Sequence, residues 1–133
     1  MASIRKEVVI RADPETAWAA LRDFGAPHKR LVPGFVVDTT LDGDERVVTF
    51  FNGSVARERL VAVDDEGRRV VYSVVESALG VTHHNASAQV VPDSDGWIRV
   101  VWIADVLPHE VAPVIGELMD RGAAAMKRAL EQQ

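Results

Sequence analysis

The chain of 133 residues contains no cysteine. Disulfide bonds, thiolate chemistry and zinc sites with cysteine ligands are therefore excluded. Basic residues are fewer than acidic ones, and the formal net charge is −5. This balance argues against the clustered cationic surface that binds nucleic-acid phosphates, and more weakly against binding to anionic lipid headgroups. We expect no nucleic-acid partner.

Long apolar runs and several chemical motifs are missing as well. No unbroken apolar stretch is long enough to cross a bilayer, and residues 1–7 lack the apolar region of a secretory signal. We therefore expect no integral membrane segment and a cytoplasmic location. There is no Gly-rich phosphate-binding loop and no G-x-S-x-G motif, so phosphate cradles and serine-nucleophile chemistry have no support.

The composition that remains is typical of a globular domain. Hydrophobic residues make up 47% of the chain and charged residues 26%. A chain of this length can bury one sizeable core. It contains no internal repeat and no low-complexity linker, so we expect a single domain over residues 1–133.

Alternating apolar and polar residues, separated by turn signals, predict seven strands. Asp42-Gly43 is a strong hairpin signal, and Gly or Pro residues punctuate the later turns at regular spacing. The resulting antiparallel meander has its strands at residues 3–11, 35–41, 45–51, 55–63, 69–77, 82–91 and 97–106.

Two regions have helical periodicity instead. Asp13 is a candidate N-cap with Pro14 at the first helical position, and residues 27–33 form a second short turn. After Pro108 the apolar residues follow one stripe of a C-terminal helix of about six turns. A long amphipathic helix and an antiparallel sheet must bury their apolar faces against each other, which predicts an α+β fold.

Three groups of residues stand out along this order of elements: Ile10-x3-Pro14-x3-Trp18-x2-Leu21-x-Asp23-Phe24, then Glu58-Arg59-Leu60 with Tyr72, then Pro92-x3-Gly96 with Trp102 and Pro108. With them the chain resembles the helix-grip fold of the START-like or SRPBCC superfamily, which includes polyketide cyclases, lipid-transfer domains and birch-pollen-allergen-like proteins. The resemblance covers the whole chain and implies a curved, mostly antiparallel seven-stranded sheet wrapped around the C-terminal helix, with a short helix pair after strand 1. It implies a cavity between sheet and helix but no single reaction.

The two-residue period of a strand predicts which side chains face the helix. The arginines at 57, 59 and 69 are expected outside, which places the other face inside. The first hairpin fits this scheme only if Asn52-Gly53 belongs to a three-residue connection or a bulge. The inward set is then Phe35, Val37, Val48, Phe50, Glu58, Leu60, Ala62, Val70, Tyr72, Val74, Glu76, His84, Ala86, Ala88, Val90, Ile98, Val100, Trp102 and Ala104.

Small inward residues should leave room for a ligand. Ala86, Ala88, Ala104 and Gly122 face large residues, and unfilled apolar volume is what a binding cavity needs. In this scheme Tyr72 lies opposite Ala88, Trp102 opposite Ala86, and Glu76 opposite His84.

Four inward side chains could carry chemistry: Glu58, Tyr72, Glu76 and His84. A buried carboxylate is costly without a partner, so Glu58 reaches water, meets a group such as Tyr72, or serves a ligand. Glu76 and His84 could form an acid/base couple, or a pair exposed at the open end of two strands. His83 and His84 point to opposite faces and no third ligand is evident, so we expect no metal and no cofactor.

Three hypotheses follow. The first is binding of an apolar or aromatic small molecule; the second is an enzyme of the polyketide cyclase/aromatase or lyase kind, with Tyr72 as donor and a carboxylate or His84 as base. The third is a regulatory protein whose ligand controls a partner.

Valines 61, 63, 71 and 75 on the outer face could form a homodimer surface or lie beneath the first helix pair. The expected ligand-binding residues are Phe35, Phe50, Glu58, Tyr72, Val74, His84, Ala86, Ala88, Trp102, Leu118 and Gly122.

Overall fold

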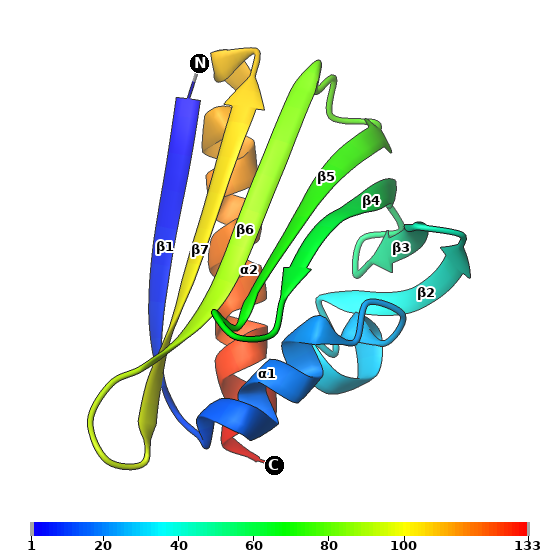
Figure 1. Ribbon diagram of the computed structural model, residues 1–133. Coiled ribbons are helices and arrows are strands. Elements are labelled where there is room, and N and C mark those ends of the chain that lie inside the picture. The colour runs from blue at the N-terminus through cyan, green and yellow to red at the C-terminus, as the bar shows by residue number, and fades with distance from the viewer. Residues whose placement is uncertain (1, 133) are drawn as a thin grey trace.

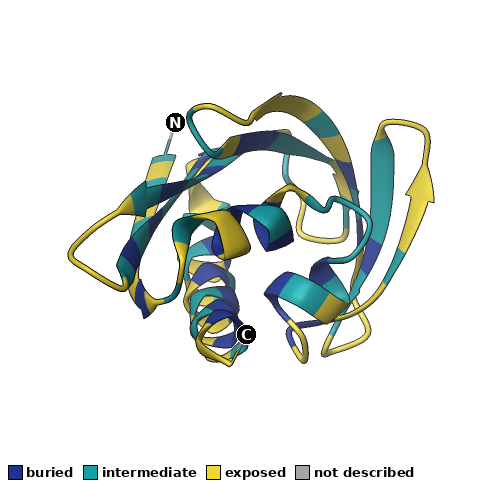
Figure 2. Cartoon of the chain, turned by 60° about the horizontal axis from the view of Figure 1, so that its bottom comes forward, coloured by how far each residue is buried: buried dark blue, intermediate teal, exposed yellow. Residues whose placement is uncertain are grey.

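A computed structural model describes residues 2–132. One antiparallel sheet of seven strands, in the order β1-β7-β6-β5-β4-β3-β2, curves around the long helix α2 (Figures 1 and 2). The predicted α+β helix-grip architecture is confirmed, and the strand boundaries agree within one residue. The elements are β1 (Ala2–Arg11), α1 (Pro14–Arg22), the π-helical turn η1 (Pro27–Leu31), β2 (Val36–Asp42), β3 (Glu45–Phe50), β4 (Val55–Asp64), β5 (Arg69–Ser77), β6 (His83–Pro92), β7 (Trp97–Leu107), the 3-10 turn η2 (His109–Val111) and α2 (Ala112–Glu131).

The first helix begins where the sequence indicates. The Asp13 side chain accepts a hydrogen bond from the Thr16 N–H at 3.0 Å, which satisfies a backbone donor of the first turn. Trp18 lies on the buried face of α1, and its indole N–H donates to Asp65 in the β4–β5 turn. The helix α1 packs against β5 and β6, and η1 packs against α2 and β2. Together they close one end of the space between sheet and α2.

The helix α2 is 20 residues long and buries one stripe against the sheet. Gly122 on this helix faces two aromatic rings: a Cβ atom built there would be 3.0 Å from the Trp102 ring and 3.2 Å from Phe35. A larger residue at this position would require the rings to shift. No helix in the described range 2–132 is both long and apolar enough to cross a membrane.

The predicted set of inward side chains requires a three-residue connection between β3 and β4. That connection is present. The Phe50 N–H donates to the Ser54 carbonyl at 2.8 Å, which leaves residues 51–53 as the connection. Val48 consequently pairs with Ala56, and both are buried. The predicted pairs Glu58–Val74 and Leu60–Tyr72 are also confirmed.

Two other predicted pairs are wrong by two residues. Tyr72 pairs with Ala86, and Ala88 pairs with Trp102. The Asp93 N–H donates to the Trp97 carbonyl at 3.0 Å, which leaves residues 94–96 as the β6–β7 connection in place of the predicted 92–96. Because the observed register differs from the predicted one by two residues, an even number, each side chain keeps its predicted face.

Three inward predictions are wrong because β-bulges shift the alternation. Val37 is 52% exposed because the register shifts between residues 36 and 38, and Val36 is buried in its place. Ala62 is exposed beyond a shift between residues 60 and 62. Glu58 pairs with Val74, but its neighbour Arg57 pairs with Glu76, so β5 has one extra residue at this point. Glu76 therefore lies beside Arg57 on the outer face. A bulge adds one residue to one strand and thereby turns the following side chains to the other face.

Candidate functional site

A cavity of about 240 Å³ lies between the inner face of the sheet, η1 and α2. Most of its wall is apolar, and α1 contributes Leu21 at the closed end. Its lining includes the following residues expected from the sequence: Phe35, Phe50, Glu58, Tyr72, Val74, His84, Ala88, Trp102 and Leu118. Two expected residues, Ala86 and Gly122, are buried but are not among those that line it.

The inward side chains in the middle of the sheet keep accessible surface although they face the helix. Tyr72, Val74 and Trp102 are only partly buried. Their neighbours on the same face, such as Val70 and Val100, are 4% and 1% exposed. The residual accessibility of the central side chains is therefore accessibility to the cavity.

The mouth of the cavity is marked by lining residues that are exposed to solvent. They come from the β3–β4 connection and the start of β4, from the β5–β6 connection and from the first turn of α2, at the end of the molecule opposite α1 (Figure 1). Their side chains are mostly apolar: Val55 is 50% exposed, Leu79 39% and Val114 48%. A molecule entering the cavity would pass these residues first.

A buried ion pair crosses the inner wall. Arg46 and Glu58 are cross-strand partners on β3 and β4, and Arg46 Nε lies 2.7 Å from Glu58 Oε1. Their side chains are 12% and 9% exposed. Arg46 also donates to the Phe24 carbonyl at 3.2 Å, and its guanidinium carbon lies 4.0 Å from the centre of the Phe24 ring. Glu58 therefore has a fixed cationic partner.

Sequence reasoning missed Arg46. The signal was present, because residues 46, 48 and 50 share one face of a strand, and Val48 and Phe50 were placed inside. Of the partners expected for Glu58, Tyr72 is close enough for the carboxylate charge to affect its hydroxyl but forms no hydrogen bond with it among the described residues.

Tyr72 and Trp102 join the centre of the sheet. Trp102 Nε1 donates to the Tyr72 hydroxyl oxygen at 3.0 Å. Burial raises the pKa of the Tyr72 hydroxyl, and the negative charge of Glu58 raises it further. The hydroxyl consequently keeps its proton at neutral pH and can act as a donor.

His84 is held in a single tautomer. The Val74 N–H donates to Nδ1 at 3.0 Å, so the proton of the neutral ring is on Nε2. The ring centres of His84 and Tyr72 are 5.9 Å apart. Burial lowers the pKa of His84, and the Coulombic effect of Glu58 acts in the opposite direction. His84 is thus a neutral donor in the cavity wall.

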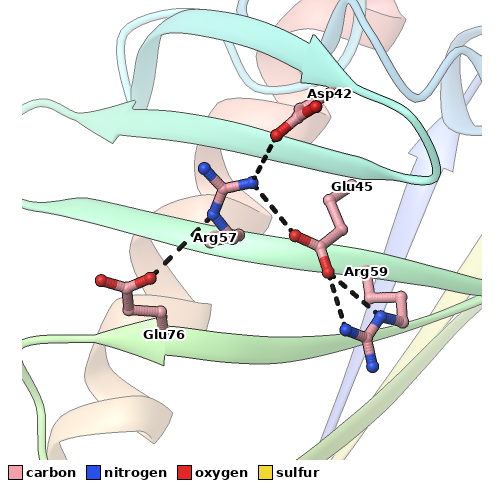
Figure 3. A network of polar contacts seen from close by, with 5 residues as sticks. All are labelled: Asp42, Glu45, Arg57, Arg59 and Glu76. Atoms are coloured by element: carbon pink, nitrogen blue, oxygen red, sulfur yellow. Dashed lines mark hydrogen bonds and ion pairs between the residues drawn. The ribbon is translucent and has the colours of Figure 1, made fainter.

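Glu76 does not belong to this group, so the predicted Glu76–His84 couple is wrong. The Glu76 side chain is 80% exposed and lies 4.0 Å from Arg57 Nε. Arg57 also donates to Asp42 and Glu45 at 3.0 Å each, and Arg59 donates to Glu45 at 2.8 Å (Figure 3). These five residues form an ion-pair ladder on the outer face, behind the cavity wall.

The chemistry available in the cavity is limited. Arg46 and Glu58 compensate each other's charge, and Tyr72 and His84 are neutral donors. Within residues 2–132 no group of three or more His, Cys, Asp or Glu side chains could hold a metal ion. The arrangement can solvate one polar group of an otherwise apolar molecule.

Comparison with known proteins agrees with this geometry. The family model described as polyketide cyclase / dehydrase and lipid transport matches residues 1–133. No curated protein matches the sequence significantly. Among solved structures, XoxI from Bacillus cereus is 22% identical with a TM-score of 0.88, and the alignment covers 98% of this chain and 96% of that one.

Two further structures are informative. A START superfamily protein from Mycobacterium smegmatis is 16% identical with a TM-score of 0.78, covering 98% of this chain and 97% of that one. Norcoclaurine synthase from Thalictrum flavum, solved with dopamine and hydroxybenzaldehyde, is 25% identical with a TM-score of 0.72, covering 98% of this chain and 84% of that one.

Proposed function

We propose that this chain, which belongs to the polyketide cyclase / dehydrase and lipid transport family, binds an apolar or aromatic small molecule between its sheet and α2. The observation that carries the proposal is the cavity of about 240 Å³. An apolar cavity of about 150 Å³ accommodates benzene. A ligand of one or two rings, or a short chain of similar volume, fits the space.

The lining residues support this ligand class. Aromatic and aliphatic side chains from α1, η1, α2 and the strands β2 to β7 face the space, and polar groups are few. A structural neighbour, norcoclaurine synthase, was solved with two single-ring aromatic molecules, dopamine and hydroxybenzaldehyde. Ligands of that size are compatible with the volume found here.

Native mass spectrometry of the freshly purified protein, followed by extraction, tests the proposal. We expect a bound apolar molecule, or a mass shift when small aromatic compounds are added. Absence of binding by a panel of one- and two-ring compounds at millimolar concentration would contradict the proposal.

A cavity-filling variant gives a sharper test. Ala88 is 3% exposed and lines the cavity, so Ala88→Leu should occupy ligand volume and reduce binding. Ala62→Leu is the matched control, because Ala62 is exposed and lies outside the lining. Equal binding by the two variants would place the ligand elsewhere.

A second candidate is catalysis of the polyketide cyclase/aromatase or lyase kind. The observation in its favour is that Glu58, Tyr72 and His84 all line one cavity, with Tyr72 and His84 able to donate protons. The ion pair with Arg46 favours a structural role for the carboxylate. The two functions differ when the extracted molecule is incubated with fresh protein: only an enzyme converts it, and Tyr72→Phe should then stop the conversion.

Some wider expectations stay predictions. We infer a single START-like domain over residues 1–133 and a cytoplasmic location. A homodimer through the outer face stays a prediction that sedimentation would test: Val61 is 55% exposed and Val75 41%, whereas Val71 is buried and Val63 pairs with the inward-facing Val70.

A further inference from the structure

Two hydrogen-bond donors in the cavity wall have no acceptor among residues 2–132. The Tyr72 hydroxyl accepts from Trp102, but no described residue accepts the proton that the hydroxyl itself carries. His84 Nδ1 accepts from Val74, and no described residue bonds to the Nε2 position. Both side chains line the cavity.

These donors lie next to each other on one wall. Tyr72 pairs with Ala86 across β5 and β6, and His84 is two residues from Ala86 on the same face. Diagonal neighbours of this kind come within reach of aromatic side chains, and the ring centres are 5.9 Å apart. The two rings therefore present their donors from the same wall of the cavity.

Both groups can donate to an acceptor placed in the cavity. Polar groups buried in an apolar space are normally hydrogen-bonded, and an unpaired donor is unfavourable. Oxygens of carbonyl type accept two hydrogen bonds and donate none. A ligand that carries such an oxygen would accept hydrogen bonds from Tyr72 and His84, whereas a hydrocarbon of the same shape would leave both donors unpaired.

The charge balance selects a neutral molecule. The cavity contains one cation and one carboxylate, Arg46 and Glu58, and they already form an ion pair at 2.7 Å. A charged ligand would enter without a compensating charge, which is costly in a desolvated site.

We propose that the cavity takes a neutral one- or two-ring molecule with a carbonyl-type oxygen, which accepts hydrogen bonds from Tyr72 and His84. The inference rests on the proposed function, since it names the ligand class of the same cavity. It follows from the two unused donors and the paired charges, and it predicts a preference that a purely apolar cavity would not have.

The test compares three probes of similar size: 1-tetralone, tetralin and tetralin-1-carboxylate. Amide NMR titration of the complete protein gives each dissociation constant. We expect 1-tetralone to bind about fivefold to tenfold more tightly than tetralin, the effect of one or two net hydrogen bonds, and the carboxylate to bind more weakly than the ketone.

Variants locate the preference. Tyr72→Phe should bring the ratio between ketone and hydrocarbon close to one while tetralin binding is retained, and His84→Leu should reduce the ratio in part. His83→Leu is the matched control, because His83 is the exposed neighbour on the same strand.

The outcomes separate the two proposals. Equal or tighter binding of tetralin would overturn the carbonyl inference and leave cavity binding intact, and tightest binding of the carboxylate would overturn the neutral-ligand inference. Failure of all three probes to bind would instead count against the proposed function itself. A preference for the ketone that persists in Tyr72→Phe and His84→Leu alike would overturn the assignment to this wall.

Discussion

The β3–β4 strand pair carries arginine–carboxylate pairs on both of its faces. On the inner face Arg46 meets Glu58 with side chains 12% and 9% exposed. On the outer face Arg57 and Arg59 share Glu45, and Arg57 also reaches Asp42, whose side chain is 72% exposed. The residue types and the distances are alike, so the two faces differ in how far solvent reaches the charged groups.

Exposure to solvent determines how much each pair contributes to stability. Exposed pairs contribute little to stability because water screens the charges and the long side chains lose conformational freedom. A buried pair gains little over an apolar pair of the same volume, but removal of one partner leaves an uncompensated charge. Loss of one inner partner should therefore destabilise the cavity wall strongly, whereas the outer ladder contributes little to stability.

The largest expected effect comes from removal of one inner partner. Arg46→Met leaves Glu58 unpaired and should lower the free energy of unfolding by about 3–5 kcal/mol, measured by urea denaturation. The double variant Arg46→Met with Glu58→Leu should recover most of the loss because no charge remains buried.

Arg59→Met is the matched control on the outer face, where the arginine side chain is 52% exposed. Its unfolding midpoint should stay close to that of the unmodified protein. If Arg46→Met and Arg59→Met had equal effects, burial would not distinguish the two faces.

The next effect concerns how tightly the inner face is packed against α2. A Cβ at Gly122 would lie 3.0 Å from the Trp102 ring. Gly122→Ala should therefore cost about 1–3 kcal/mol through overpacking, in addition to disturbing the bond from Trp102 to Tyr72.

Gly116 offers a control in the same helix. A Cβ there would meet only Ile4 at 3.8 Å, an ordinary contact. Gly116→Ala should stabilise the protein by about 0.5–1 kcal/mol, because alanine is the better helix former. Urea denaturation of both variants measures the difference, and a stabilising Gly122→Ala would show that the aromatic wall can move.

The faces of the sheet were predictable where strict alternation holds. The turns at residues 43–44, one residue beyond the predicted Asp42-Gly43, and at 51–53 set the register, and Val48 and Glu58 were correctly placed inside. The bulges that turn Val37 and Glu76 outward depend on the curvature of the finished sheet and leave no local signal in the sequence. Arg46 was missed for another reason: arginine is usually exposed, and only its partner Glu58 makes the inward position tolerable.

The pH dependence of stability should also differ between the two faces, with a smaller effect than the substitutions above. Burial lowers the pKa of His84 below its ordinary value of 6.5. Below that value the unfolded chain binds a proton that the folded chain does not, so this stabilisation is complete above pH 6.5 and declines as pH falls toward the lowered pKa.

The outer face responds at lower pH. Hydrogen bonds from Arg59 and then Arg57 lower the pKa of Glu45 below its ordinary value of 4.5. Its contribution is present above pH 4.5 and declines as pH falls below that value. Urea midpoints measured from pH 7 to pH 3 should show two phases, and His84→Gln should flatten only the upper one. An upper phase unchanged in His84→Gln, yet absent from His83→Gln, would contradict this assignment.

The smallest effect is expected from the residue with the largest number of outer partners. Arg57 reaches Asp42, Glu45 and Glu76 (Figure 3). Asp42 and Glu76 are 72% and 80% exposed, Glu45 is 16% exposed, and the arginine side chain itself is 32% exposed. Arg57→Met should shift the thermal unfolding midpoint by little more than the error of measurement, and added salt should reduce the shift further because it screens exposed charges. The same salt titration should leave the loss in Arg46→Met nearly unchanged, because buried charges are screened much less. A salt-insensitive loss in Arg57→Met would show that the ladder acts as a desolvated network and would remove the distinction between the two faces.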